Sequence, residues 1–150
     1  MNNNEVVSIL DRLIEICRTG QTGFRNAADS IRNSEFRRLF NIFLQQRIQF
    51  ETELRAEAHR LRGNAAETVE PEPRRNNTVP FRSSKIASTV GFRDEAGVIA
   101  ECQTEEEAAV VEYQKALEAD LPLDVQYVVK RQYMDIKDAY DRIRILQRAA

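Results

Sequence analysis

The sequence is poor in the residues that proteins use to bind metals, to form disulfides and to break helices. Its 150 residues include one histidine, two cysteines, no tryptophan, five glycines and four prolines. One histidine is a poor supply for metal or acid–base chemistry. Two cysteines cannot cross-link a fold of this size, so we expect a reducing, cytoplasmic location. The scarcity of glycine and proline favours helix, because both residues break it.

Other absences exclude whole classes of protein. No apolar run reaches the ~20 residues that a membrane-spanning helix needs, so we expect no membrane partner. The start, Met1 to Glu5, lacks the basic and apolar regions of a secretory signal. The formal net charge of −2 argues against general nucleic-acid binding. The sequence has no glycine-rich phosphate loop, Ser/His/Asp set or Cys-x-x-Cys motif, and it therefore favours a non-enzymatic protein over an enzyme.

Two segments of the chain carry the spacing of amphipathic helices. In each segment, apolar residues recur at alternating steps of three and four, which is the pattern of a helix with one buried face. Asn33 or Ser34 is the expected N-cap between the first two helices, and Gly63 is a plausible C-terminal stop for the second. The spacing predicts helices at residues 4–32, 34–62, 94–119 and 122–148.

Residues 63–93 separate the two helical hairpins. Three of the four prolines lie there and no apolar period is sustained, so we expect a long linker with a short turn near residues 85–89. About thirty residues at up to ~3.3 Å each can reach the length of a helix of ~28 residues, roughly 42 Å. The second and third helices can therefore be parallel neighbours joined by a crossover. The sequence predicts an all-α, ferritin-like four-helix bundle that forms a single domain over residues 1–150.

The ligand pattern of ferritin-like di-iron proteins is missing. Such a site needs carboxylates from two helices and a Glu-x-x-His pair from each of the other two, and no Glu-x-x-His occurs here. His59 lies opposite the apolar seam, so we expect it to be exposed, and Glu15 is expected to be a solvated carboxylate. We predict no definite cofactor. The candidates for a degenerate site that would hold iron or manganese are Glu101, Glu105, Gln132 and Asp135.

Several polar side chains interrupt the apolar seams and are expected in the bundle interior. A buried, unpaired guanidinium costs several kcal/mol, so Arg47 must find a carboxylate or reach solvent. We expect a structural ion pair that fixes helix register; a snorkelling Arg47 and a functional pocket are the alternatives. A paired Arg47 would put its charge where a cation would sit, which tells against a metal. The expected structural polar core pairs Arg47 with Glu105 or Glu106 and uses Gln132 as a bridge.

Cysteines, tyrosines and glycines give three weaker expectations. Cys17 and Cys102 lie on inner faces and are expected to be small buried apolar groups, with a redox pair as the alternative. A cavity beside Gly20 and Gly23 would suit a carrier of an apolar ligand. The tyrosines expected to fill space with their hydroxyls at the core edge are Tyr113, Tyr133 and Tyr140.

Short strings spread over both hairpins form a recognisable set. They are Leu13–Phe24, Gln45–Phe50, Ala100–Cys102, Asp120–Pro122, Arg131–Tyr133 and Asp141–Arg144. In this order they resemble a bacterial family of small ferritin-like four-helix-bundle proteins of unknown function. The resemblance implies a cytoplasmic bacterial protein, of a kind that is described together with stress-related helical bundles. It implies no established activity.

The chain departs from that family at two places. The family's linker usually carries a helical His-Arg-x-Trp element, whereas Asn76–Gly91 contains neither histidine nor tryptophan. Tyr140 stands where relatives often have histidine, which puts any metal role of that position in doubt here. We therefore expect a non-enzymatic structural or interaction protein, with a role in stress physiology and a homo-oligomer or protein partner. The alternative is a metal-binding ferritin-like protein with a degenerate site.

Overall fold

The computed structural model describes residues 1–63 and 95–149, and four helices account for most of them. The helices are α1 (Asn3–Ser30), α2 (Ser34–Arg62), α4 (Glu95–Glu118) and α5 (Leu123–Ala149). These ends differ by at most two residues from the ranges expected from the sequence. Residues 64–94, which hold almost all of the expected linker, its turn and the expected helix start at Asp94, lie outside the described residues. The all-α four-helix bundle is confirmed.

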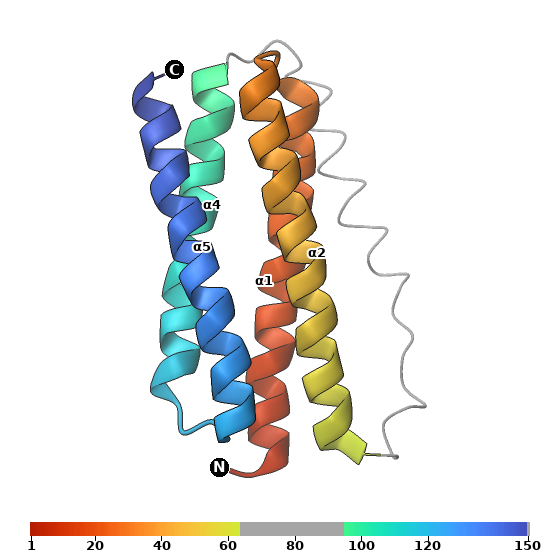
Figure 1. Ribbon diagram of the computed structural model, residues 1–150. Helices are drawn as coiled ribbons and strands as arrows, with labels where there is room; N and C mark the ends of the chain where they lie inside the picture. Colours follow the sequence, from red (N-terminus) through yellow and green to blue (C-terminus); the bar gives the residue numbers. More distant parts are fainter. Residues whose placement is uncertain (64–94, 150) are drawn as a thin grey trace.

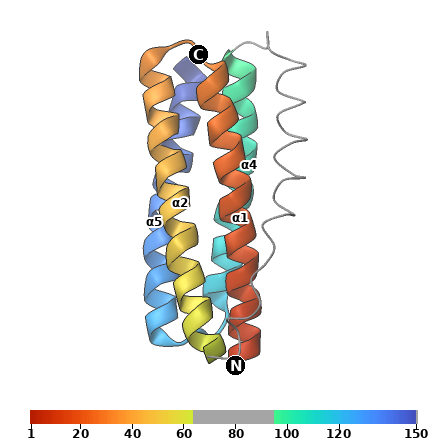
Figure 2. The same ribbon diagram turned by 90° about the vertical axis from the view of Figure 1, so that its right-hand side faces the viewer.

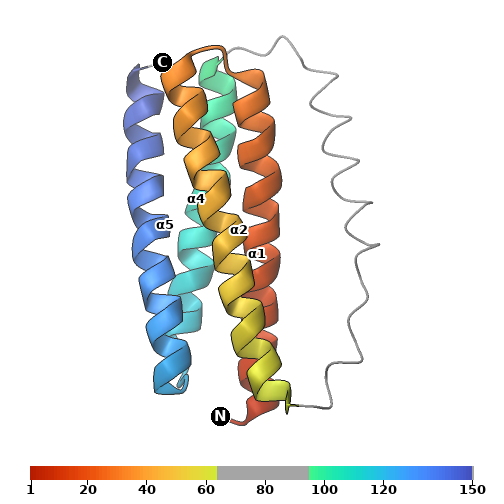
Figure 3. The same cartoon turned by 45° about the vertical axis from the view of Figure 1, so that its right-hand side comes forward.

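The four helices lie side by side with neighbours in opposite directions. Figure 1 shows α1 and α5 running one way and α2 and α4 the other, and the turned views in Figures 2 and 3 show the same arrangement. Contacts join α1 to α2 and α4, and join α5 to α4 and α2. The parallel direction of the second and third helices is therefore confirmed, as a crossover requires. The expectation that these two are neighbours is wrong, because α2 and α4 lie across the bundle diagonal. This placement makes every adjacent pair antiparallel, so neighbouring helix dipoles oppose each other.

Side chains at the helix starts fix where two of the elements begin. Asn2 accepts a hydrogen bond from the backbone N–H of Glu5, and the Glu5 carboxylate accepts one from the backbone N–H of Asn2, both at 2.9 Å. Asn33 is the cap of α2, and its side chain accepts hydrogen bonds from the second and third amides of that helix, those of Glu35 and Phe36. Each cap satisfies amides that have no partner inside the helix. Gly63 ends α2 with a φ of 72°, a conformation that favours glycine.

Two apolar clusters fill the bundle, one above the other. One cluster contains Phe24, Phe40 and Phe43, whose ring centroids lie 5.4–6.0 Å apart. The other contains Leu10, Leu54 and most of the buried side chains in the half of the bundle where α1 begins, the lower half in Figure 1. Along α1, α2 and α4 the two clusters are separated by Gly20, Arg47 and Glu106 respectively. The packing therefore leaves a polar layer between two apolar cores.

The surface holds the residues that the helical spacing places outside. His59 and Glu15 are both exposed, as expected. Tyr133 and Tyr140 are half-buried at the edge of the lower cluster, also as expected. No helix within residues 1–63 and 95–149 is both long and apolar enough to cross a membrane.

Candidate functional site

Three polar side chains are fully enclosed by the bundle. Arg47 and Glu106 are each 1% exposed, and Gln132 is 0% exposed. All three were expected inside from their positions on the apolar seams. The contacts divide them into two separate groups, one a buried ion pair and the other a chain of hydrogen bonds. We describe these groups in turn, because their chemistry decides what the interior can do.

The charged group is an ion pair between Arg47 on α2 and Glu106 on α4. Nη2 of Arg47 donates to Oε2 of Glu106, so the pair bridges the diagonal of the bundle. The guanidinium carbon also lies 5.1 Å from the centroid of the Phe24 ring, a favourable cation–π position. Burial raises the pKa of Glu106, and the charge and hydrogen bond of Arg47 oppose that rise. Within the described part of the structure, Nε of Arg47 has no hydrogen-bond partner.

Gly20 gives the guanidinium its space. A Cβ atom added at Gly20 would lie 2.5 Å from Nη1 of Arg47 and 3.4 Å from its Cγ. Gly23, one turn later on α1, faces the carboxyl group of Glu105 in the same way. The sequence suggested an apolar-ligand cavity beside these two glycines. That expectation is wrong, because the side chains of Arg47 and Glu105 occupy the space.

Glu105 is not the partner of Arg47, although it directly precedes Glu106 on α4. Its residue is largely exposed, while its carboxyl end is shielded where it lies over Gly23 of α1. This shielding, together with the carboxylates of Glu101 and Glu106, raises the pKa of Glu105 to about 7. Of the two carboxylates expected to pair with Arg47, the structure selects Glu106.

The second group is a chain of hydrogen bonds to which each helix contributes one side chain. The hydroxyl of Tyr113 on α4 donates to Oε1 of Gln132 on α5 at 2.8 Å. Nε2 of Gln132 donates to Oε1 of Glu53 on α2, also at 2.8 Å. Sγ of Cys17 on α1 lies 3.4 Å from the Tyr113 hydroxyl. Since that hydroxyl proton is used for Gln132, the Cys17 thiol is the donor. The chain thus runs from the buried Cys17 to the half-buried Glu53.

This chain corrects two expectations. Gln132 does not bridge the Arg47 pair, because its amide is used by Tyr113, Glu53 and the carbonyl of Phe50. Tyr113 is fully buried and does not lie at the core edge. Ala109 and Ala116, one turn away on either side along the α4 seam, are the sequence signal that could have placed its ring deeper. Small neighbours leave room for a large side chain between them.

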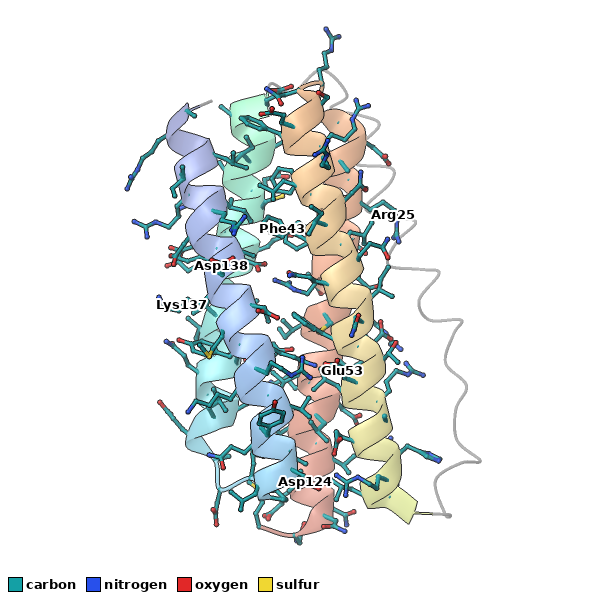
Figure 4. The ribbon with its side chains drawn as sticks, viewed as in Figure 1. Arg25, Phe43, Glu53, Asp124, Lys137 and Asp138 are labelled. Carbon is teal, nitrogen blue, oxygen red and sulfur yellow. The ribbon has the colours of Figure 1, made fainter. Side chains whose placement is uncertain are left out.

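The two ends of this hydrogen-bond chain, Cys17 and Glu53, differ in acidity. Burial raises the pKa of the Cys17 thiol to about 11, so it stays protonated and unreactive near neutral pH. Although burial acts to raise it, the pKa of Glu53 is lowered by hydrogen bonds from Gln132, Gln49 and Arg131. The side chain of Glu53, labelled in Figure 4, lies beside α5 and pairs there with Arg131 at 3.1 Å. Cys17 and Cys102 are buried in different apolar clusters. The two thiols of the alternative redox pair are therefore kept apart.

The four candidate metal ligands do not gather around Gln132. Glu101 and Glu105 lie one turn apart on α4 and are both exposed, whereas Gln132 is enclosed by the Tyr113–Glu53 chain. Asp135 is half-buried on α5. No group of three or more His, Cys, Asp or Glu side chains in the described residues could hold a metal ion.

A di-iron centre of the ferritin type does not fit this interior. That centre needs several anionic oxygen ligands that face one another between the helices. Here Glu106 is the buried carboxylate among the described residues, and the guanidinium of Arg47 neutralises it. The other inward polar positions are an amide and a phenol that already bond to each other. The polar side chains that the structure describes in the interior therefore support helix packing and do not form a ferritin-type di-iron site.

The fold and part of the sequence match known proteins. The family described as a domain of unknown function, DUF2383, matches residues 5–119, which end before α5. No curated protein sequence matches the chain significantly. A solved structure that it resembles is a two-domain protein from Anabaena variabilis, which contains DJ-1/ThiJ/PfpI-like and ferritin-like domains. The TM-score is 0.80 at 13% identity, over 99% of this chain and 40% of that one. The chain thus spans less than half of that protein, and the likeness shows a shared fold.

Proposed function

The chain belongs to the DUF2383 family and has a ferritin-like fold, and from that premise we propose that it acts as a non-enzymatic structural or interaction protein. One observation carries the proposal: the Arg47–Glu106 ion pair occupies the bundle interior with both side chains 1% exposed. In this position the pair ties the diagonal helices α2 and α4 together. A buried pair of this kind contributes little net stability, yet it strongly penalises arrangements in which either charge is left alone. Its role in the bundle is to fix helix register.

The alternative function is metal binding by carboxylates near the surface. The observation that favours it is the closeness of Glu101 and Glu105, since the charge of the first helps to raise the pKa of the second. A bound cation would relieve that repulsion. Against it stands the lack of a third acidic or imidazole ligand among the described residues. Two exposed carboxylates alone make a weak and unselective site.

Elemental analysis separates the two functions. The protein is purified without chelator from cells supplemented with iron or manganese, and its metal content per chain is measured. We expect far less than one metal ion per chain, and no change on Glu101→Ala or Glu105→Ala. Glu15→Ala, which removes an exposed carboxylate from α1, is the matched control. A stoichiometric metal ion that is lost in Glu101→Ala or Glu105→Ala and retained in Glu15→Ala would establish the metal function instead.

We place this role in a bacterial cytoplasm. The support for the compartment is that Cys17 and Cys102 lie in different apolar clusters and form no disulfide with each other. The bacterial source and the stress-related role rest on the family resemblance alone. The partner is a protein, either a second copy of this chain or another molecule, because the proposed function acts through surfaces.

A further inference from the structure

We draw no further inference here: the strongest candidate, the surface patch of exposed apolar side chains on the outer face of α5 (Leu123, Tyr127, Met134 and Ile145), is interrupted by charged residues, and nothing in the structure shows what covers it.

Discussion

The Arg47–Glu106 pair and the hydrogen-bond chain through Gln132 are buried in the same bundle but satisfy their polar atoms in different ways. The pair joins two charges across the diagonal, and within the described residues it leaves Nε of Arg47 without a partner. The chain passes through the uncharged side chains of Cys17, Tyr113 and Gln132 and ends at the Glu53 carboxylate, which pairs with Arg131. The pair is thus the more demanding group, because each charge depends wholly on the other.

That difference teaches how to interpret polar residues inside a ferritin-like bundle. A carboxylate at an inward position is compatible with a metal ligand, but here an arginine from the opposite helix neutralises it. An inward glutamine is compatible with a ligand as well, but here its amide joins α5 to Tyr113 of α4 and to the Glu53 carboxylate of α2. The fold alone therefore does not imply metal chemistry. The comparison can be tested by breaking each group separately.

The largest effect is expected from leaving Arg47 without its partner. Glu106→Leu should lower the free energy of unfolding by about 3–5 kcal/mol, because it strands a buried guanidinium. Urea denaturation followed by circular dichroism measures the change. Glu107→Leu is the matched control, since Glu107 is the next residue on α4 and is exposed. It should change stability by less than about 0.5 kcal/mol. Equal effects of the two variants would contradict the special role of the pair.

A smaller effect is expected from removing the space that Gly20 provides. Gly20→Ala puts a Cβ atom 2.5 Å from Nη1 of the enclosed Arg47, which cannot move to solvent. Overpacking of this kind costs about 1–3 kcal/mol. Gly23→Ala meets the carboxyl group of Glu105, which can swing outward, so it should be close to neutral. The melting temperatures of both variants test this difference. A Gly23→Ala protein that is less stable than Gly20→Ala would contradict the prediction.

Breaking the hydrogen-bond chain through Gln132 should cost less again. Tyr113→Phe removes the hydroxyl that donates to Gln132 and should lower the free energy of unfolding by about 1 kcal/mol. Tyr133→Phe is the control, because its hydroxyl accepts a hydrogen bond from Gln114 at the bundle surface. Chemical denaturation should show the control closer to wild type. A Tyr113→Phe loss as large as that of Glu106→Leu would remove the contrast between the two groups.

The last expected effect depends on pH and concerns Glu105, whose carboxyl group lies over Gly23 of α1. Its pKa rises from the usual 4.5 to about 7 on folding, so between these values the folded chain binds a proton that the unfolded chain has released. Stability should therefore fall as pH rises from about 4.5 to 7. Glu105→Gln should flatten this slope, and Glu107→Gln should not. Melting temperatures measured across this range check the prediction; an unchanged slope in Glu105→Gln would contradict it.

The sequence predicted the helices and the inward positions of Arg47 and Gln132, because both follow from the seven-residue spacing of the seams. It left the partner of Arg47 open, since Glu105 and Glu106 differ by about 100° around α4 and only the rotation of that helix decides between them. It missed the depth of Tyr113, because hydroxyl burial depends on a partner from another helix. The diagonal arrangement of α2 and α4 likewise depends on contacts among all four helices.

A double-mutant cycle on the unfolding free energy tests the central claim that Arg47 and Glu106 act as one structural unit. It compares wild type with Arg47→Met, Glu106→Leu and the protein that carries both changes. The account predicts that the double variant is more stable than Glu106→Leu alone and lies within about 1 kcal/mol of wild type, since apolar side chains can replace a buried ion pair without loss. Losses that simply add up in the double variant would show that the two residues act independently, and would contradict the account.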